Sequence, residues 1–127
     1  PDHEVFAFLK TLEFVWIDAR DQFDVELLRN SLRSLLARPQ LTGLVILDLA
    51  RWEDWSVMDQ LAQGYGSGLY ADRDVRQYII RYLLAATKDE STADAPPPHV
   101  EQARKYLEEL RKSDPKTVAY VERFRFD

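Results

Sequence analysis

Apolar side chains recur every three or four residues along most of the chain, which is the spacing of a helix that buries one face. The pattern predicts helices over six segments: 3–18, 25–37, 55–64, 74–87, 99–112 and a last one that begins at Asp114–Pro115. Residues 41–52 are apolar on nearly every side, so periodicity alone does not separate a buried strand from a buried helix. We expect a helix there, because no second strand is evident to pair with its backbone.

Capping residues mark where several of these helices begin. Asp24 and Asp54 stand just before two of the predicted helices, where a carboxylate accepts hydrogen bonds from the first free amides. Either Asp72 or Asp74 has this role ahead of the helix over 74–87. The helix boundaries are therefore predicted from local signals alone.

Short connections join successive helices, and such connections make neighbouring helices antiparallel. The chain of 127 residues is the size of one domain. We therefore expect a single all-α domain over 1–127, with about seven helices in antiparallel hairpins, as a short α-solenoid or an irregular bundle. Residues 88–98 are polar and rich in proline, and they predict a flexible loop. The chain begins at Pro1, so we expect it to be a piece of a longer protein.

One turn carries a family resemblance. Residues Leu69–Arg76 read LYADRDVR, which resembles the turn of a HEAT repeat, where aspartates lead into Val-Arg at the start of the second helix. Ser113–Val118 echoes this turn without the arginine, and Ala50–Asp59 is similar to stretches of uncharacterised bacterial helical-repeat proteins. The chain thus resembles HEAT/armadillo-like helical-repeat proteins, and the resemblance implies stacked helical hairpins without implying an activity.

Composition and charge exclude several classes of function. Apolar residues make up 46% of the chain and no apolar run approaches the ~18 residues of a membrane span, so we expect no membrane insertion by this segment. The net charge is −5, which argues against nucleic acid as a partner, because nucleic-acid-binding domains are usually basic. Cysteine is absent, which excludes disulfides, thiolate metal sites and cysteine nucleophiles. No feature of the sequence predicts the compartment.

No combination of residues predicts an active site. His3 and His99 stand apart from each other and from other metal-ligand types, so neither a metal site nor a Ser-His-Asp triad is indicated. The glycines of 64–68 lack the Lys-Ser/Thr pair that follows a phosphate-binding loop, and we expect a helix–helix connection there. We therefore predict no enzyme, no cofactor and no metal.

Asp48 is the one candidate for acid–base chemistry, because it lies within the apolar segment 41–52. A carboxyl group buried there with a raised pKa is a possible general acid if it opens onto a pocket. The alternative is a structural ion pair, with Arg51 or Arg76 as the partner, and we expect this one.

The candidate interaction residues are aromatic and aliphatic. Phe6, Phe14 and Ile17 fall away from the buried stripe of the first helix, and a monomer rarely exposes three such groups together. Trp52 and Trp55 flank two acids, and they are either surface anchors or the corner between two helices. We expect the first set to be covered by a partner protein, by upstream chain or by a second copy in a homodimer.

These observations predict a non-catalytic helical-repeat scaffold for protein–protein interaction. The alternative is a nucleic-acid-binding HEAT-like domain that uses the cations of the C-terminal half. Those cations are Arg73, Arg76, Arg81, Arg104, Lys105 and Arg111.

Overall fold

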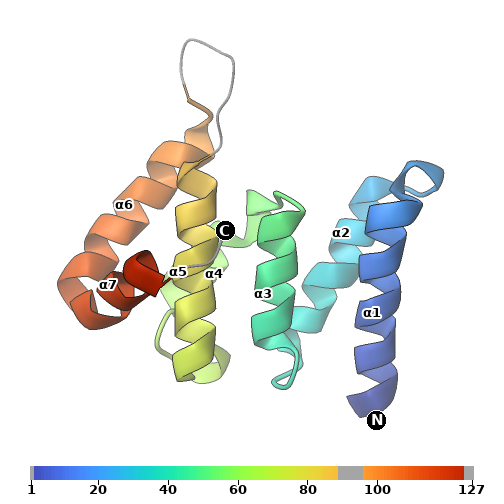
Figure 1. Ribbon diagram of the computed structural model, residues 1–127, viewed down its shortest axis with the longest axis horizontal. Helices are drawn as coiled ribbons and strands as arrows, with labels where there is room; N and C mark the ends of the chain where they lie inside the picture. The colour runs from blue at the N-terminus through green and yellow to red at the C-terminus, as the bar shows by residue number, and fades with distance from the viewer. Residues whose placement is uncertain (1, 89–95, 125–127) are drawn as a thin grey trace. The chain divides into compact units, whose positions relative to one another are not determined.

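Seven α-helices make up most of the part of the chain that this computed structural model describes, residues 2–88 and 96–124 (Figure 1). They are α1 (Asp2–Asp18), α2 (Val25–Ser34), α3 (Thr42–Arg51), α4 (Met58–Gly64), α5 (Arg73–Thr87), α6 (Pro98–Ser113) and α7 (Pro115–Phe124). Four short 3₁₀ turns lie between them: η1 (Arg20–Gln22), η2 (Leu35–Ala37), η3 (Trp55–Val57) and η4 (Gly68–Tyr70). The described residues contain no strand, so the predicted all-α class is confirmed.

The helix boundaries follow the capping residues. Asp24 Oδ1 accepts hydrogen bonds from the amides of Glu26 at 2.9 Å and Leu27 at 3.3 Å, as predicted for an N-cap. Asp72 Oδ2 accepts from the amides of Asp74 at 2.9 Å and Val75 at 3.2 Å, so Asp72 and not Asp74 is the N-cap of α5.

Two predicted helices are tighter at one end than expected. The helix predicted over 25–37 is α-helical only to Ser34 and ends in η2, and the helix predicted from residue 55 begins as η3. Of the loop predicted over 88–98, residues 89–95 lie outside the described residues, and Pro98 already belongs to α6. Each difference is a change of helical pitch or of one residue, because the first and last turns of α-helices often tighten into 3₁₀ turns.

The chain divides into two compact units, Pro1–Asp54 and Trp55–Asp127, here called unit 1 and unit 2. In unit 1, α2 packs against both α1 and α3, and successive helices run in opposite directions (Figure 1). Their facing sides bury a common set of side chains: Leu9, Leu12, Leu28, Leu32, Val45, Ile46 and Leu49. The prediction of a single domain over the whole chain stays a prediction.

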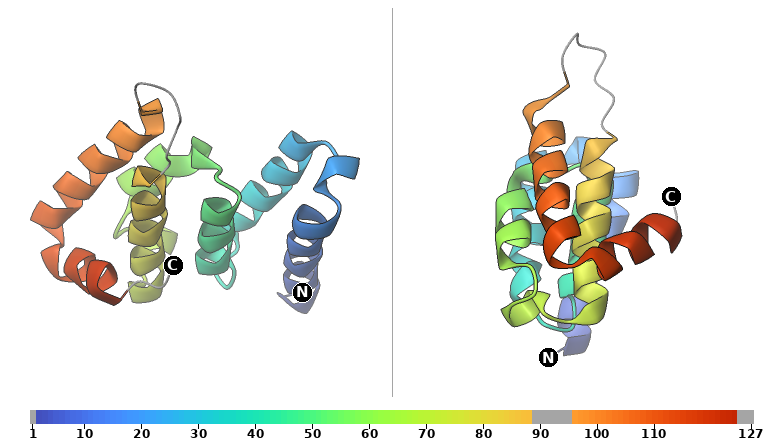
Figure 2. Two further views of the ribbon diagram at one scale, coloured as in Figure 1. Left: turned by 45° about the horizontal axis from the view of Figure 1, so that its top comes forward. Right: turned by 90° about the vertical axis from the view of Figure 1, so that its left-hand side faces the viewer.

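Unit 2 is built around α5. This helix packs against α4, α6 and α7, and α7 crosses it steeply (Figure 2). Ile79, Tyr82 and Leu83 of α5 are completely buried, which accounts for the apolar stripe predicted on this helix.

The end of α3 has an unusual backbone. The amide of Asp54 donates to the carbonyl of Leu49 at 2.9 Å, and that of Glu53 donates to Ala50 at 3.0 Å. This pair of bonds is the Schellman motif, in which the residue after the helix takes a left-handed conformation that glycine usually supplies. Here Glu53 occupies that position with φ +55°. The turn therefore fixes the directions of Trp52, Glu53 and Asp54.

The cap of α5 gives a direct test of the fold. We expect Asp72→Ala to lower the free energy of unfolding by about 1 kcal/mol, because two amides lose their acceptor. Asp74→Ala is the matched control and should cost less than half as much. Urea unfolding followed by circular dichroism measures both, and equal losses would show that Asp72 is not the cap.

Candidate functional site

Two tryptophans from distant parts of the sequence stack in unit 1. Trp16 lies near the end of α1 and Trp52 directly follows α3, and their rings are parallel within 4° with centroids 4.1 Å apart. Trp52 is 4% exposed. Aromatic stacking of this kind buries a large area and joins the two helices. Trp52, a predicted interaction residue, is therefore a packing residue of unit 1.

Two arginines lie beside the Trp16 ring. The guanidinium carbons of Arg20 and Arg29 lie 5.1 Å and 5.7 Å from the ring centroid, within cation–π distance. Together with Arg51 they line an open pocket of about 390 Å³. Its remaining walls are both tryptophans, Val25 and Glu53. We call this the arginine–tryptophan pocket; the sequence did not predict it, because its parts come from three segments.

The three pocket arginines differ in their partners. Arg29 Nη1 lies 3.7 Å from a Glu26 carboxylate oxygen, and its buried Nε has no hydrogen-bond partner within the described residues. Arg51 pairs with Asp48. Arg20 donates to the carbonyl oxygen of Trp16 at 3.3 Å, and no ion pair of Arg20 is found among the described residues. The pocket thus contains guanidinium N–H groups, on Arg20 and Arg29, that have no acceptor within the described residues of unit 1.

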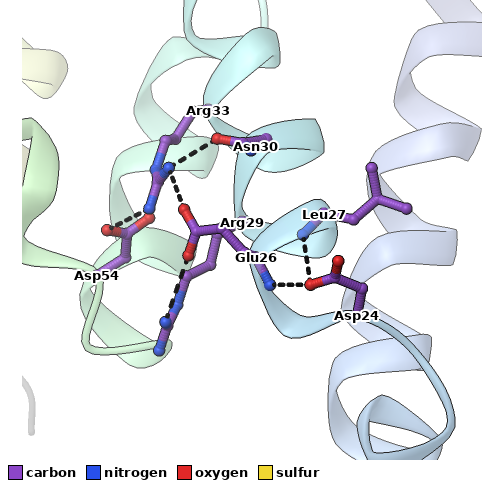
Figure 3. Close-up of polar contacts among 7 residues, drawn as sticks. All are labelled: Asp24, Glu26, Leu27, Arg29, Asn30, Arg33 and Asp54. Carbon is purple, nitrogen blue, oxygen red and sulfur yellow. Dashed lines mark hydrogen bonds and ion pairs between the residues drawn. The ribbon is translucent and has the colours of Figure 1, made fainter.

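Arg33, which does not line the pocket, has a hydrogen-bond partner for each of its three guanidinium nitrogens and holds the end of unit 1 (Figure 3). Arg33 donates to both carboxylate oxygens of Asp54, from Nε at 2.7 Å and from Nη2 at 3.0 Å. Its Nη1 donates to Glu26 at 2.9 Å and to Asn30 at 2.8 Å. Asp54 is 4% exposed, so this two-pronged pair neutralises a buried carboxylate. The sequence assigned Asp54 to a helix cap and did not reveal its link to α2.

Asp48 forms the ion pair that the sequence predicted. Arg51 Nη1 lies 3.0 Å from Asp48 Oδ1, whereas Arg76 pairs with Asp114 in unit 2. Asp48 is 2% exposed and does not line the arginine–tryptophan pocket. The structural interpretation of this carboxyl group is therefore the one that the geometry supports.

The sequence did not reveal a second partner of Asp48. Burial, and then a hydrogen bond with the Glu13 carboxyl group of α1, raise the pKa of Asp48 to about 7. The same contact with Asp48 is the main cause that lowers the pKa of Glu13, which also pairs with Lys10 at 3.2 Å. Two carboxyl groups in contact favour one shared proton, and Asp48 carries it at acidic pH.

The outer face of α1 carries the exposed apolar residues that the sequence singled out. The exposed fractions are 43% for Phe6, 63% for Phe14 and 76% for Ile17. The ammonium group of Lys10 lies over the Phe6 ring, 5.4 Å from its centroid. That these side chains bind a partner stays a prediction.

Trp55, the other predicted interaction residue, belongs to unit 2. Its ring meets Tyr82 edge-on at a centroid distance of 5.1 Å and stacks near His99 at 5.5 Å. Trp55 therefore packs against Tyr82 and His99 within unit 2, whereas Phe6, Phe14 and Ile17 belong to unit 1.

Most cations of the nucleic-acid alternative lie beside acids in unit 2. Arg76 pairs with Asp114 at 3.2 Å, and Tyr65 donates to the same carboxylate at 2.7 Å. Arg104 lies 3.8 Å from Glu101, and Arg111 lies within 3.7 Å of two glutamates on α6 and α7. Such pairs are typical of a solvated helical face.

None of the helices in residues 2–88 and 96–124 is long and apolar enough to cross a membrane. In comparisons with known proteins, no family model, no curated protein and no solved structure matches this chain. The resemblance to HEAT/armadillo-like proteins therefore stays a prediction.

The shared proton makes stability depend on pH. Asp48 loses its proton near its usual pKa of 3.8 in the unfolded chain but near 7 in the folded one. Its stabilising contribution is thus complete below about pH 4 and is lost as the pH rises to 7. The lowered pKa of Glu13 has the opposite sign, but it acts as the pH falls below the usual value of 4.5.

We therefore expect the free energy of unfolding to fall by about 2 kcal/mol more between pH 5 and pH 7.5 in the wild type than in Asp48→Asn. Asparagine keeps a neutral polar group at this site and does not titrate. Urea unfolding at both pH values, followed by tryptophan fluorescence, measures the difference. Equal pH dependence of the two proteins would rule out Asp48 as the group that titrates.

Loss of the Arg33–Asp54 pair should lower the free energy of unfolding by more than the pH change through Asp48 does. Arg33→Met keeps the length of the side chain but leaves a buried carboxylate without its guanidinium, so we expect a loss of about 3 kcal/mol. Arg38→Met changes an exposed arginine of the same unit and should stay within about 0.5 kcal/mol of the wild type. If both variants unfold at the same urea concentration, the pair does not stabilise unit 1.

Proposed function

We propose that this chain is a non-catalytic helical scaffold that binds another protein through the outer face of α1. The observation that carries the proposal is the joint exposure of Phe6, Phe14 and Ile17 on one helix. Three large apolar side chains along one helix face are a typical mark of a protein-binding surface.

The inner face of the same helix supports this proposal. Leu9 is completely buried and Leu12 is 5% exposed, so α1 already has an apolar side that anchors it to its own unit. The outer side chains are not needed for that packing. A helix that is apolar on two faces is suited to packing between its own unit and a partner.

The alternative partner, nucleic acid, has weaker support. Arg76, Arg104 and Arg111 already pair with acids, and the chain carries a net charge of −5. A phosphate backbone would have to displace several of these acids at once, which weakens the electrostatic attraction that drives such binding.

Photo-crosslinking tests the proposed surface. A photoreactive phenylalanine analogue at position 14 should give one discrete protein adduct in cells, either with a second copy of this chain or with another protein. The same analogue in place of Tyr120, which is 51% exposed on α7, is the matched control and should give no such adduct.

A second variant makes the result specific to the apolar face. Ile17→Glu should abolish the adduct at position 14, because a charge one helical turn away disrupts an apolar contact. Light scattering at two concentrations then shows whether the partner is a second copy. The proposal fails if position 14 gives no adduct, or if positions 14 and 120 give the same adducts.

A further inference from the structure

The arginine–tryptophan pocket is an unassigned feature of unit 1. It lies where the end of α1, the beginning of α2 and the turn after α3 meet, and its volume is about 390 Å³. This is roughly ten times the volume that one water molecule occupies in the liquid. The pocket is therefore large enough for a small charged group together with part of the side chain that carries it.

The charges that line the pocket are mostly positive. Arg20, Arg29 and Arg51 face one carboxylate, that of Glu53. Two of the guanidinium groups, those of Arg20 and Arg29, lie within 5.7 Å of the Trp16 ring centroid, so both charges stand beside the same wall of the pocket. An anion that binds in the pocket would be attracted by both guanidinium groups.

Hydrogen-bonding capacity points the same way. The buried Nε of Arg29 has no acceptor in the described part of the chain, although buried donors are almost always paired. Arg20 donates only to a backbone carbonyl in that part of the chain. Glu26, at 3.7 Å from Arg29, orients this arginine but leaves its Nε free.

We propose that this pocket binds a single phosphate group, carried by a peptide of a partner protein. A phosphate matches the planar, forked donors of arginine and accepts several hydrogen bonds at once. The stacked tryptophans supply a rigid wall beside the charged groups, because the Trp16–Trp52 pair is fixed by its own packing.

The charge of unit 1 favours an isolated phosphate over a nucleic acid. Residues 1–54 contain six basic and ten acidic residues, a net charge of −4. An extended polyanion is repelled by this field, whereas one phosphate in the pocket is influenced mainly by the adjacent arginines. The pocket is separate from the exposed side chains Phe6 and Phe14, so this proposal stands whether or not α1 binds a protein.

Calorimetric titration of the whole chain tests the proposal. The probes are a short neutral peptide with one phosphoserine, its unphosphorylated twin, inorganic phosphate and a single-stranded DNA oligonucleotide, all at low ionic strength. We expect the phosphopeptide to bind and its twin to give no heat. Inorganic phosphate should bind more weakly than the phosphopeptide, because it lacks contacts with the apolar wall.

Matched variants locate the binding. Arg20→Gln and Arg29→Gln should each weaken phosphopeptide binding about tenfold, because each removes a charged donor. Glu53→Gln should tighten it about threefold, because it removes a carboxylate of the pocket wall that would repel the phosphate. Arg38→Gln removes an exposed arginine of the same unit that does not line the pocket, and it should leave the affinity unchanged.

The outcomes separate the sources of the anion. Equal affinities for inorganic phosphate and phosphopeptide would overturn the peptide as the carrier, and tighter binding of the oligonucleotide would do so in favour of nucleic acid. Absence of heat with the phosphopeptide, or equal losses in Arg20→Gln and Arg38→Gln, would overturn the site. Circular dichroism of each variant shows that a loss of binding is not a loss of folding.

Discussion

A buried carboxylate needs a cation, and in unit 1 an arginine of α2 meets this requirement just after the third helix ends. Arg33 meets Asp54 with two hydrogen bonds and uses its remaining terminal nitrogen on Glu26 and Asn30 (Figure 3). Removing either charge alone would leave the other without its main partner at a partly or wholly buried position. The pair therefore ties α2 to the turn that follows α3.

The neighbours of Asp54 depend on this anchor. Glu53 and Trp52 precede it in the same turn, so the ion pair and the two backbone hydrogen bonds together set the direction of both side chains. Trp52 then reaches the ring of Trp16, and Glu53 reaches the rim of the pocket. The ion pair between Arg33 and Asp54 thus helps to position the Trp16–Trp52 stack and the carboxylate of Glu53 in the pocket wall.

Features that depend on neighbouring residues could be predicted from the sequence, and features that join distant segments could not. Asp24 caps α2 and Arg51 pairs with Asp48 because their partners lie within four positions along the chain. The contacts of Trp16 with Trp52 and of Glu13 with Asp48 cross 35 or more residues. Periodicity indicates which side of a helix is buried, but it does not indicate which buried side chains meet. The pocket was missed for this reason.

The conformation of Glu53 has a consequence for how this sequence is maintained. A left-handed backbone at a residue with a Cβ costs about 1 kcal/mol relative to glycine. Glutamate and glycine codons differ by a single base, so one mutational step would remove the strain. Selection for folding stability alone would favour that step. The acid at this turn therefore lowers the free energy of unfolding relative to a glycine at the same position, and it places a negative charge in the wall of the pocket.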